Sequence, residues 1–186
     1  MYNPTTTYNN TFIRNIYSPG SAYLQLSYFK LNLNLGFTPW VGTDNRGLSI
    51  YDKNKFLSTT IDFEKAAALY ITSKKILDQK EDKAIQLTLN CNKQTTLHLD
   101  YSPDNNGQMR ARFTIEKQGQ HISIIFNTAP YKYKDNNGQV HHAIMQVGLG
   151  VFMKTLDAYL CAIGAERHLN KLSEEEMNNP PESLNW

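Results

Sequence analysis

The stretch LSTTIDFEKAAALYITSKKIL, residues 57–77, decides the fold because its apolar period changes from two to about 3.6 within it. Leu57, Thr59 and Ile61 alternate with polar residues, as in a strand with one buried face. Beyond Asp62, an expected N-cap, the spacing predicts a helix. Its predicted buried face consists of Phe63, Ala66, Ala67, Tyr70, Ile71 and Leu77.

Strand patterns lie on both sides of this helix. Before it, Leu31, Leu33 and Leu35 alternate with polar residues, and Leu48 and Ile50 repeat the pattern, which predicts one buried face. After it, the same alternation predicts strands around residues 85–89, 97–101, 109–115, 122–126 and 140–147. A second helix is expected from about residue 150 to 160 or on to 172, interrupted or capped at Gly164.

The two helical segments share a sequence phrase. Phe63, Lys65 and Tyr70 recur as Phe152, Lys154 and Tyr159, and the turn at residues 44–47 recurs at residues 135–138. We therefore predict an α+β fold with a duplicated unit, an antiparallel sheet of about four strands followed by a helix, with chance recurrence as the alternative. The expected domain is residues 18–172, with repeats at about 18–80 and 81–172, between a flexible arm (residues 1–17) and an acidic tail (residues 173–186).

The distribution of charge favours an anionic partner. The net charge is +2, but residues 173–186 hold four glutamates and no Lys or Arg, so the rest of the chain carries 19 basic and 13 acidic residues, or +6. Two cysteines, Cys91 and Cys161, make no disulfide framework and fit a reducing compartment. We see no secretion signal and no stretch near the roughly 18 apolar residues of a membrane span, so we expect a cytoplasmic protein without membrane contact.

Residues that alternate with the apolar ones should face outward and supply a binding surface. Cations can neutralise phosphates, and aromatic rings can stack on unpaired bases. The clearest local pattern is the alternation of aromatic and basic residues at 131–134. The alternatives are a solvated sheet face for each lysine and inward packing for the tyrosines. The residues predicted to bind nucleic acid are Lys30, Trp40, Tyr51, Lys53, Lys55, Arg110, Arg112, Tyr131, Lys132, Tyr133 and Lys134.

Catalytic patterns are weak in this sequence. His141 and His142 are adjacent, so on a strand they point to opposite faces and do not share a metal. Zinc-ligand pairs and a phosphate-binding glycine loop are missing. His98 and Asp100 share a strand face and are the one candidate acid–base pair. We predict a non-catalytic protein with no metal and no cofactor.

The acidic tail is a candidate partner-binding segment. It contains Glu174, Glu175 and Glu176, two prolines, and the apolar pair Leu184 and Trp186, so we expect it to be mobile and to recruit a basic partner. It could also compete with nucleic acid for a cationic groove. A solubilising end is the alternative.

The strands-then-helix plan and the repeated Phe-x-Lys-x-x-x-x-Tyr phrase resemble the Whirly and transcriptional-coactivator group of single-stranded DNA-binding folds, which some tailed phages encode. The resemblance covers about residues 22–160, and the lysine-rich signature of the plant Whirly proteins is not evident. It implies strand binding by sheets and hairpins and a homo-oligomer paired through helices. The tail is similar in style to those of bacterial and phage single-strand-binding proteins, which implies recruitment of replication or recombination proteins.

These patterns predict a protein that binds single-stranded DNA, with RNA as a possible ligand. We expect it to act in DNA replication or recombination. If a phage encodes it, it would act in the cytoplasm of the bacterial host. One rival is a phage protein-interaction module, a host-factor inhibitor or virion accessory protein without nucleic-acid binding. The other is a duplex-binding regulator, which the helices do not favour because their exposed faces are not markedly basic.

Overall fold

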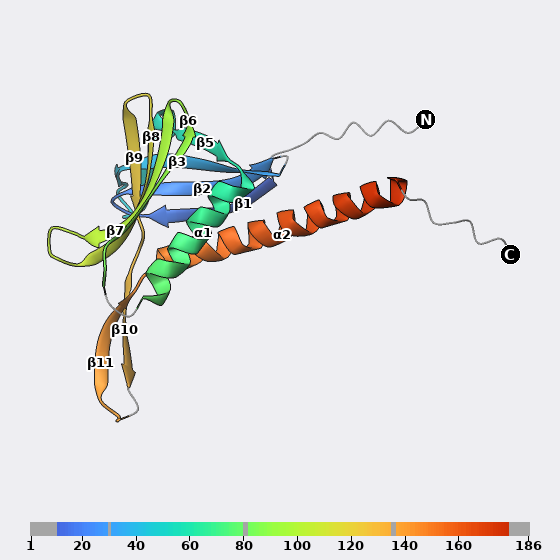
Figure 1. The fold of residues 1–186 in the computed structure, drawn as a ribbon. Coiled ribbons are helices and arrows are strands. Elements are labelled where there is room, and N and C mark those ends of the chain that lie inside the picture. The colour runs from blue at the N-terminus through green and yellow to red at the C-terminus, as the bar shows by residue number, and fades with distance from the viewer. Residues whose placement is uncertain (1–10, 30, 80–81, 135–136, 179–186) are drawn as a thin grey trace.

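The computed structural model describes residues 11–29, 31–79, 82–134 and 137–178 (Figure 1). Half of the chain is strand and 27% is helix, so the predicted mixed α+β class is confirmed. The first part of the chain forms β1 (Thr11–Ser18), β2 (Ala22–Phe29), β3 (Asn32–Thr43), β4 (Ser49–Tyr51), the 3-10 helix η1 (Lys53–Lys55), β5 (Leu57–Ile61) and α1 (Phe63–Asp78). The second part forms β6 (Ile85–Asn92), β7 (Thr95–Pro103), β8 (Met109–Lys117), β9 (Gln120–Ile125), β10 (Ala129–Lys134), β11 (Val140–Met145) and α2 (Val147–Asn178).

The first sheet has the order β1-β2-β3-β4, and β5 also pairs with β3. β3 accommodates both partners because it is twelve residues long: Leu33–Phe37 pair with β5, and Trp40–Thr43 pair with β4. The predicted flexible arm is wrong for residues 11–17, which belong to β1 and contribute the buried Ile16. Residues 1–10 lie outside the described residues.

The second sheet has the order β6-β7-β8-β9, and β10 and β11 form a separate two-stranded hairpin that projects from the body (Figure 1). All strand pairs are antiparallel. The alternation read from the sequence is confirmed here: Leu97, Leu99, Phe113, Ile115 and Ile124 are all buried. Their neighbours along each strand form the opposite, outer face of the second sheet.

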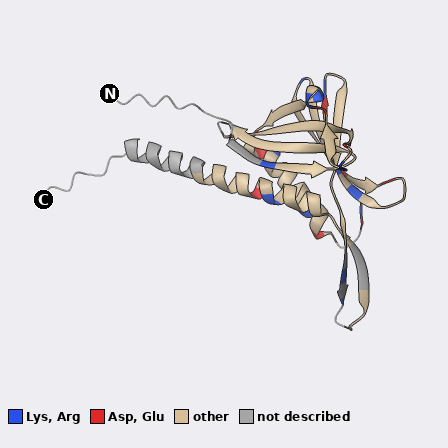
Figure 2. Cartoon of the chain, turned by 180° about the vertical axis from the view of Figure 1, so that it is seen from behind, with Lys and Arg blue, Asp and Glu red and all other residues tan. Residues whose placement is uncertain are grey.

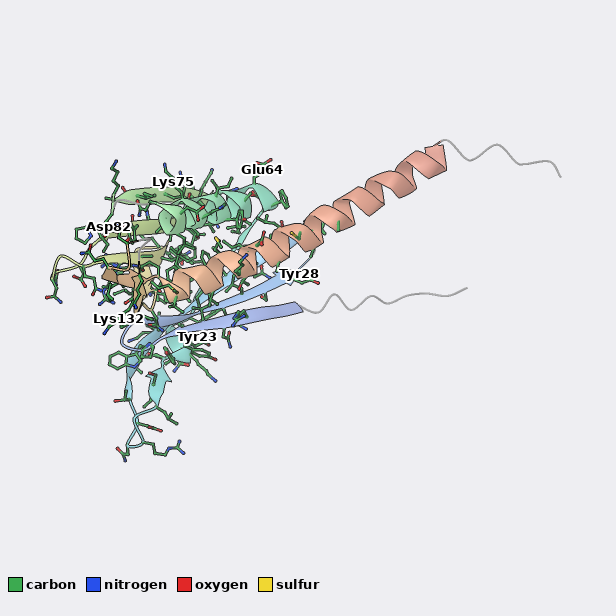
Figure 3. All side chains as sticks on the ribbon, turned by 90° about the horizontal axis from the view of Figure 1, so that it is seen from below. Tyr23, Tyr28, Glu64, Lys75, Asp82 and Lys132 are labelled. Atoms are coloured by element: carbon green, nitrogen blue, oxygen red, sulfur yellow. The ribbon has the colours of Figure 1, made fainter. Side chains whose placement is uncertain are left out.

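The core lies between the inner faces of the two sheets and the helices, which pack against each other (Figure 3). Phe113 of β8 is central to it. Its ring centroid is 5.2 Å from that of Phe37 on β3 and 5.1 Å from that of Phe152 on α2. One side chain therefore joins the first sheet, the second sheet and α2.

The buried face of α1 differs from the predicted one. Ala66, Leu69, Ser73 and Ile76 are buried, whereas Ile71 is 63% exposed. The apolar residues are spread around this helix, so spacing alone did not identify the side that meets α2 and the sheets. The N-cap is confirmed, because the Asp62 carboxylate accepts a hydrogen bond from the Lys65 amide at 2.8 Å.

The β3–β4 hairpin also corrects the sequence analysis. Leu48 and Ile50, expected on a buried face, are 57% and 45% exposed. β4 pairs with the last part of β3, where Val41 is exposed as well, so alternation there selects no core face.

α2 is longer than predicted. It continues through Gly164 to Asn178, so the first residues of the predicted mobile tail, including Glu174, Glu175 and Glu176, are helical. Its first half packs on the core through Leu149, Phe152, Leu156, Tyr159 and Ile163, and its second half projects from the body (Figure 1). Contrary to expectation, the segment Val147–Ala165 is long and apolar enough to cross a membrane by length and composition, although 39% of it is buried in the fold.

The repeated helix phrase does not occupy equivalent positions. Phe63 is the first residue of α1 and is partly buried, whereas Phe152 lies five residues after the start of α2 and is fully buried. Tyr159 donates a hydrogen bond of 2.7 Å to the carbonyl of Leu31, a turn residue with a φ of 63°. The duplicated unit therefore stays a prediction.

The two sheets meet where the β1–β2 turn covers the edge of β9. The Ser21 hydroxyl donates to the Ser123 carbonyl at 2.9 Å and accepts from the Ile125 amide at 2.8 Å. Ser18 donates to the Ile125 carbonyl. These serines form hydrogen bonds with backbone groups that an open edge strand would leave unpaired. The same groups of β9 are therefore not available for pairing with another strand.

Tyr101 provides a test of the packing around the α1–β6 connection. The buried Tyr101 hydroxyl donates to Asp82 at 2.8 Å, and burial together with this carboxylate raises the pKa of Tyr101 to about 12 from its ordinary value of 10. The unfolded chain therefore loses this proton at lower pH than the folded chain, so stability falls between pH 10 and 12.

Between pH 10 and 12, we expect the ionisation of Tyr101 to lower the free energy of unfolding by at most about 2–3 kcal/mol. Tyr101→Phe should be about 1 kcal/mol less stable than wild type at neutral pH, because it lacks the hydrogen bond, but should lose less stability at high pH. Urea unfolding of both proteins at neutral and alkaline pH measures the difference. Equal alkaline losses in the two proteins would contradict this assignment.

Candidate nucleic-acid interface

The face of the first sheet opposite the core is open. Ala22, Leu24 and Leu26 of β2 point into the core, so Tyr23, Gln25 and Ser27 point to the other face. Figure 3 shows Tyr23 on the side of β2 away from the helices. We call this surface the open face of the first sheet. Its residues come from β1, β2, β3, β4, η1 and β5, and they include Asn15, Tyr17, Tyr23, Gln25, Ser27, Asn34, Gly36, Tyr51, Phe56, Ser58 and Thr60.

Three tyrosines cluster at one end of the open face. The ring centroid of Tyr23 is 5.4 Å from that of Tyr17 and 5.1 Å from that of Tyr51. Tyr51 is partly buried by its neighbours, and this burial raises its pKa. Tyr17 is 52% exposed, and Trp40 pairs with Tyr51 across β3 and β4. The predicted stacking residue Tyr51 therefore supports the cluster, while Tyr17 offers the larger accessible ring.

A groove of about 390 Å³ occupies the middle of the open face. Its floor is Gly36, and a Cβ atom there would lie 2.5 Å from the Phe56 ring, so the absence of a side chain lets the ring lie close to the strand. Phe56 is 44% exposed. The groove is also lined by Leu35 and Thr59, which are buried, and by residues with uncharged hydrogen-bonding side chains: Gln25, Ser27, Asn34, Ser58 and Thr60.

Two predicted lysines lie on η1, between Tyr51 and Phe56 of the open face in the chain. Lys53 and Lys55 are exposed, and the short helix that carries them begins at Asp52, whose carboxylate accepts from the Asn54 amide at 3.0 Å. Lys55 Nζ lies 3.6 Å from Asp52 Oδ2, a solvent-exposed pair worth about 0–1 kcal/mol. Either lysine can therefore turn toward an anionic ligand at little cost.

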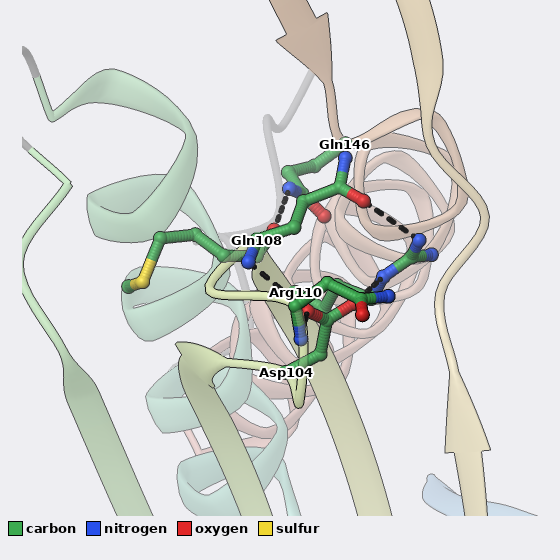
Figure 4. A network of polar contacts seen from close by, with 6 residues as sticks. Asp104, Gln108, Arg110 and Gln146 are labelled. Atoms are coloured by element: carbon green, nitrogen blue, oxygen red, sulfur yellow. Dashed lines mark hydrogen bonds and ion pairs between the residues drawn. The ribbon is translucent and has the colours of Figure 1, made fainter.

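Arg110 is engaged in its own turn on the second sheet (Figure 4). Its guanidinium donates to Asp104 at 2.8 Å and to the Gln108 side chain at 2.8 Å. The Asp104 carboxylate also accepts the amides of Asn106 and Gln108, and these bonds together with Arg110 hold its pKa below the ordinary value. Arg110 therefore has a structural role in this turn.

The turn at residues 44–48 is built in the same way. The Asp44 carboxylate accepts the amides of Leu48 and Arg46 at 2.8 and 2.9 Å, and Arg46 donates to its second oxygen. The Leu48 amide is the main cause of the lowered pKa of Asp44. Because an Asp-x-Arg spacing recruits the arginine locally, such an arginine is a weaker nucleic-acid candidate than its charge indicates.

The remaining predicted residues lie elsewhere. Arg112 is exposed on the outer face of the second sheet, opposite Asp100 in the β7–β8 register. Lys132 and Lys134 are exposed on the projecting β10–β11 hairpin, in which Tyr131 and Tyr133 occupy β10 but have side chains outside the described residues. Lys30, Leu184 and Trp186 lie outside the described residues, as do the side chains of Glu174, Glu175 and Glu176.

The predicted binding residues therefore occupy three separate sheets. Trp40, Tyr51, Lys53 and Lys55 come together at one end of the first sheet, whereas the arginines and the hairpin residues do not join them. In Figure 2 the described Lys and Arg residues are dispersed over separate elements. The described residues therefore do not join all the predicted residues into one binding surface.

The sequence analysis missed the residues that shape the open face. Tyr17 was assigned to the arm, and Phe56 precedes the strand pattern that begins at Leu57. A usable signal was the alternation of Tyr23, Gln25 and Ser27 with the apolar Ala22, Leu24 and Leu26.

Comparisons of this chain with protein-family models, curated proteins and solved structures give no match. Within the part of the chain that the structure describes, no group of three or more His, Cys, Asp or Glu side chains is arranged to hold a metal ion. The site therefore has to be interpreted from its own chemistry.

Proposed function

We propose that this protein binds single-stranded nucleic acid on the open face of its first sheet, and that its role is to hold single-stranded DNA during replication or recombination. The observation that carries the proposal is the combination of exposed rings, Tyr17 and Phe56, with uncharged amides and hydroxyls and with two exposed lysines on η1, which precedes Phe56. Rings of this kind stack on unpaired bases, and the amides can bond base edges.

An unpaired strand fits this face better than a duplex. In a duplex, the ring faces of the bases are stacked on one another and cannot stack on the rings of the protein. The sheet face also offers no element that inserts into a groove of the duplex. The two lysines on η1 can neutralise about two phosphates, so the binding depends more on stacking than on charge.

A fluorescence titration tests the proposal. The chain contains two tryptophans, Trp40 and Trp186, so a Trp186→Phe background leaves Trp40 beside the tyrosine cluster as the reporter. Addition of oligothymidylate at low salt should quench Trp40 emission. The log–log dependence of the affinity on salt should have a slope of about −1.4, as expected for about two phosphates on a single strand.

The control variant is Lys75→Gln, because Lys75 is an exposed lysine on α1, away from the open face. This variant should bind as the parent does. An excess of duplex DNA should compete poorly. A folded protein that shows no Trp40 response and no retention of labelled oligonucleotide at low salt would contradict the proposal.

A second candidate function is docking of a protein partner. Two hairpins carry exposed apolar side chains: Val41, Leu48 and Ile50 around β3–β4, and Val140, Ile144 and Met145 on β11. Exposed apolar residues that gather on projecting elements favour protein contacts. A pull-down with and without nuclease separates the two functions, because a partner bound through nucleic acid is lost after nuclease treatment.

A further inference from the structure

A groove lies on the second sheet, outside the site proposed above. It has a volume of about 520 Å³ and is formed where the β6–β7 and β8–β9 turns meet. The Gln118 side chain donates to the Gln94 side chain at 2.9 Å, and the Gln118 amide donates to the Gln94 carbonyl at 3.2 Å, so the two turns are fixed to each other. We call this the end groove. Its charged and imidazole groups are Lys93, Glu116, Lys117 and His121.

A second groove connects the end groove to the first sheet. It has a volume of about 380 Å³, and Pro39, Lys55 and Leu57 form one side while Gln120, His121 and Ile122 form the other. We call it the seam groove. It shares Gln120 and His121 with the end groove, and it contains Lys55, which immediately precedes Phe56 of the open face in the chain.

Lys117 fixes this junction. Its ammonium donates to the Ser58 carbonyl at 2.9 Å, which ties β8 to β5, and Ser58 also lines the groove over Gly36. The ammonium has three protons, so this bond leaves it able to donate to a further acceptor. Ser58 and Lys117 therefore connect the groove over Gly36 to the end groove, and the seam groove meets the end groove at Gln120 and His121.

The charges along this route suit a phosphodiester backbone. Among the residues that line the two grooves, Lys55, Lys93 and Lys117 contribute three positive charges against the carboxylate of Glu116, and Asp52 lies 3.6 Å from Lys55 Nζ. Glu116 Oε2 lies 3.6 Å from His98 Nε2, on the second-sheet side of the groove. The residues that line the two grooves therefore carry a surplus of positive charge.

We propose that a bound single strand continues from the open face past Lys55, crosses the seam groove, and ends against Lys93 and Lys117 in the end groove. This inference rests on the proposed function and extends it from one sheet to both. One molecule would then occupy a longer stretch of strand than the open face alone holds, and two more phosphates would be neutralised.

Oligothymidylates of different length test this route. Sheet-based binders of single strands occupy about 4–16 nucleotides, so lengths of about 6 and about 18 fall on either side of a two-sheet footprint. The full chain with Trp186→Phe should bind the long strand more tightly. The salt slope should steepen from about −1.4 for the short strand to about −2.8 for the long one, because two more phosphates are contacted.

Lys93→Gln is the decisive variant, and Lys75→Gln is its matched control. Lys93 is exposed at the β6–β7 turn, so its removal should leave folding intact. We expect it to weaken long-strand binding about three- to fivefold, to reduce the long-strand salt slope by about 0.7, and to leave short-strand binding unchanged. The control should match wild type for both lengths.

The outcomes separate the two proposals. Equal affinities and equal salt slopes for both lengths would overturn the route across the seam while leaving binding on the open face in place. Weaker short-strand binding by Lys93→Gln would also overturn it, since the short strand should not reach that lysine. Failure of the unaltered chain to bind either strand would overturn the proposed function itself.

Discussion

Replacing Phe113 with alanine is expected to lower the free energy of unfolding by about 3–5 kcal/mol, the largest effect that we predict for a single substitution. Phe113 is fully buried, and its ring contacts Phe37 of the first sheet and Phe152 of α2. The cavity left by its removal would lie where three elements meet, so no single element could shift to fill it. The fold as a whole, rather than one sheet, should lose stability.

Urea denaturation followed by circular dichroism measures this effect, and Phe56→Ala is a matched control. Both variants remove a phenylalanine ring, but Phe56 is 44% exposed and Phe113 is buried. We expect a loss below about 1 kcal/mol for Phe56→Ala. Similar losses in the two variants would show that Phe113 does not join the sheets as described.

Replacing Phe56 with alanine should instead reduce the affinity for single strands about tenfold, because one base would lose its stacking partner. Stacking of a base on an aromatic ring is worth about 1–3 kcal/mol, and each 1.4 kcal/mol changes affinity tenfold. Phe56 lies over Gly36 in the groove of the open face, where a base can approach it. The titration described for Trp40, repeated with this variant, gives the measurement.

Two further variants separate stacking from simple apolar contact. Phe56→Tyr keeps a ring and should retain most of the affinity, whereas Phe56→Leu keeps apolar volume without a ring and should resemble Phe56→Ala. Gly36→Ala adds a Cβ atom 2.5 Å from the present ring position and should weaken binding by displacing Phe56. If Phe56→Ala bound as tightly as wild type, the groove over Gly36 would not be a base-binding site.

The basic residues show what local sequence patterns can predict and what they cannot. Arg110 and Lys53 look alike in the sequence, since each follows an apolar strand residue closely. Arg110 is held by Asp104, six residues earlier, while Lys53 is exposed on η1, two residues after Tyr51 of the open face. An arginine near an aspartate-led turn forms a bidentate or charge-assisted bond within that turn, and this contact removes it from the binding surface.

The sequence by itself determined the local structure of this protein. The strand and helix periods, the turns led by Asp44 and Asp104, and the N-cap at Asp62 can all be read from it, because each depends on neighbours within a few residues. Only the tertiary structure decided which faces are covered. It exposed Leu48, Ile50 and Ile71, brought Phe56 over Gly36, and joined Lys117 to Ser58. These contacts link residues up to 59 positions apart. They depend on how two sheets and two helices pack, and no local period encodes that packing.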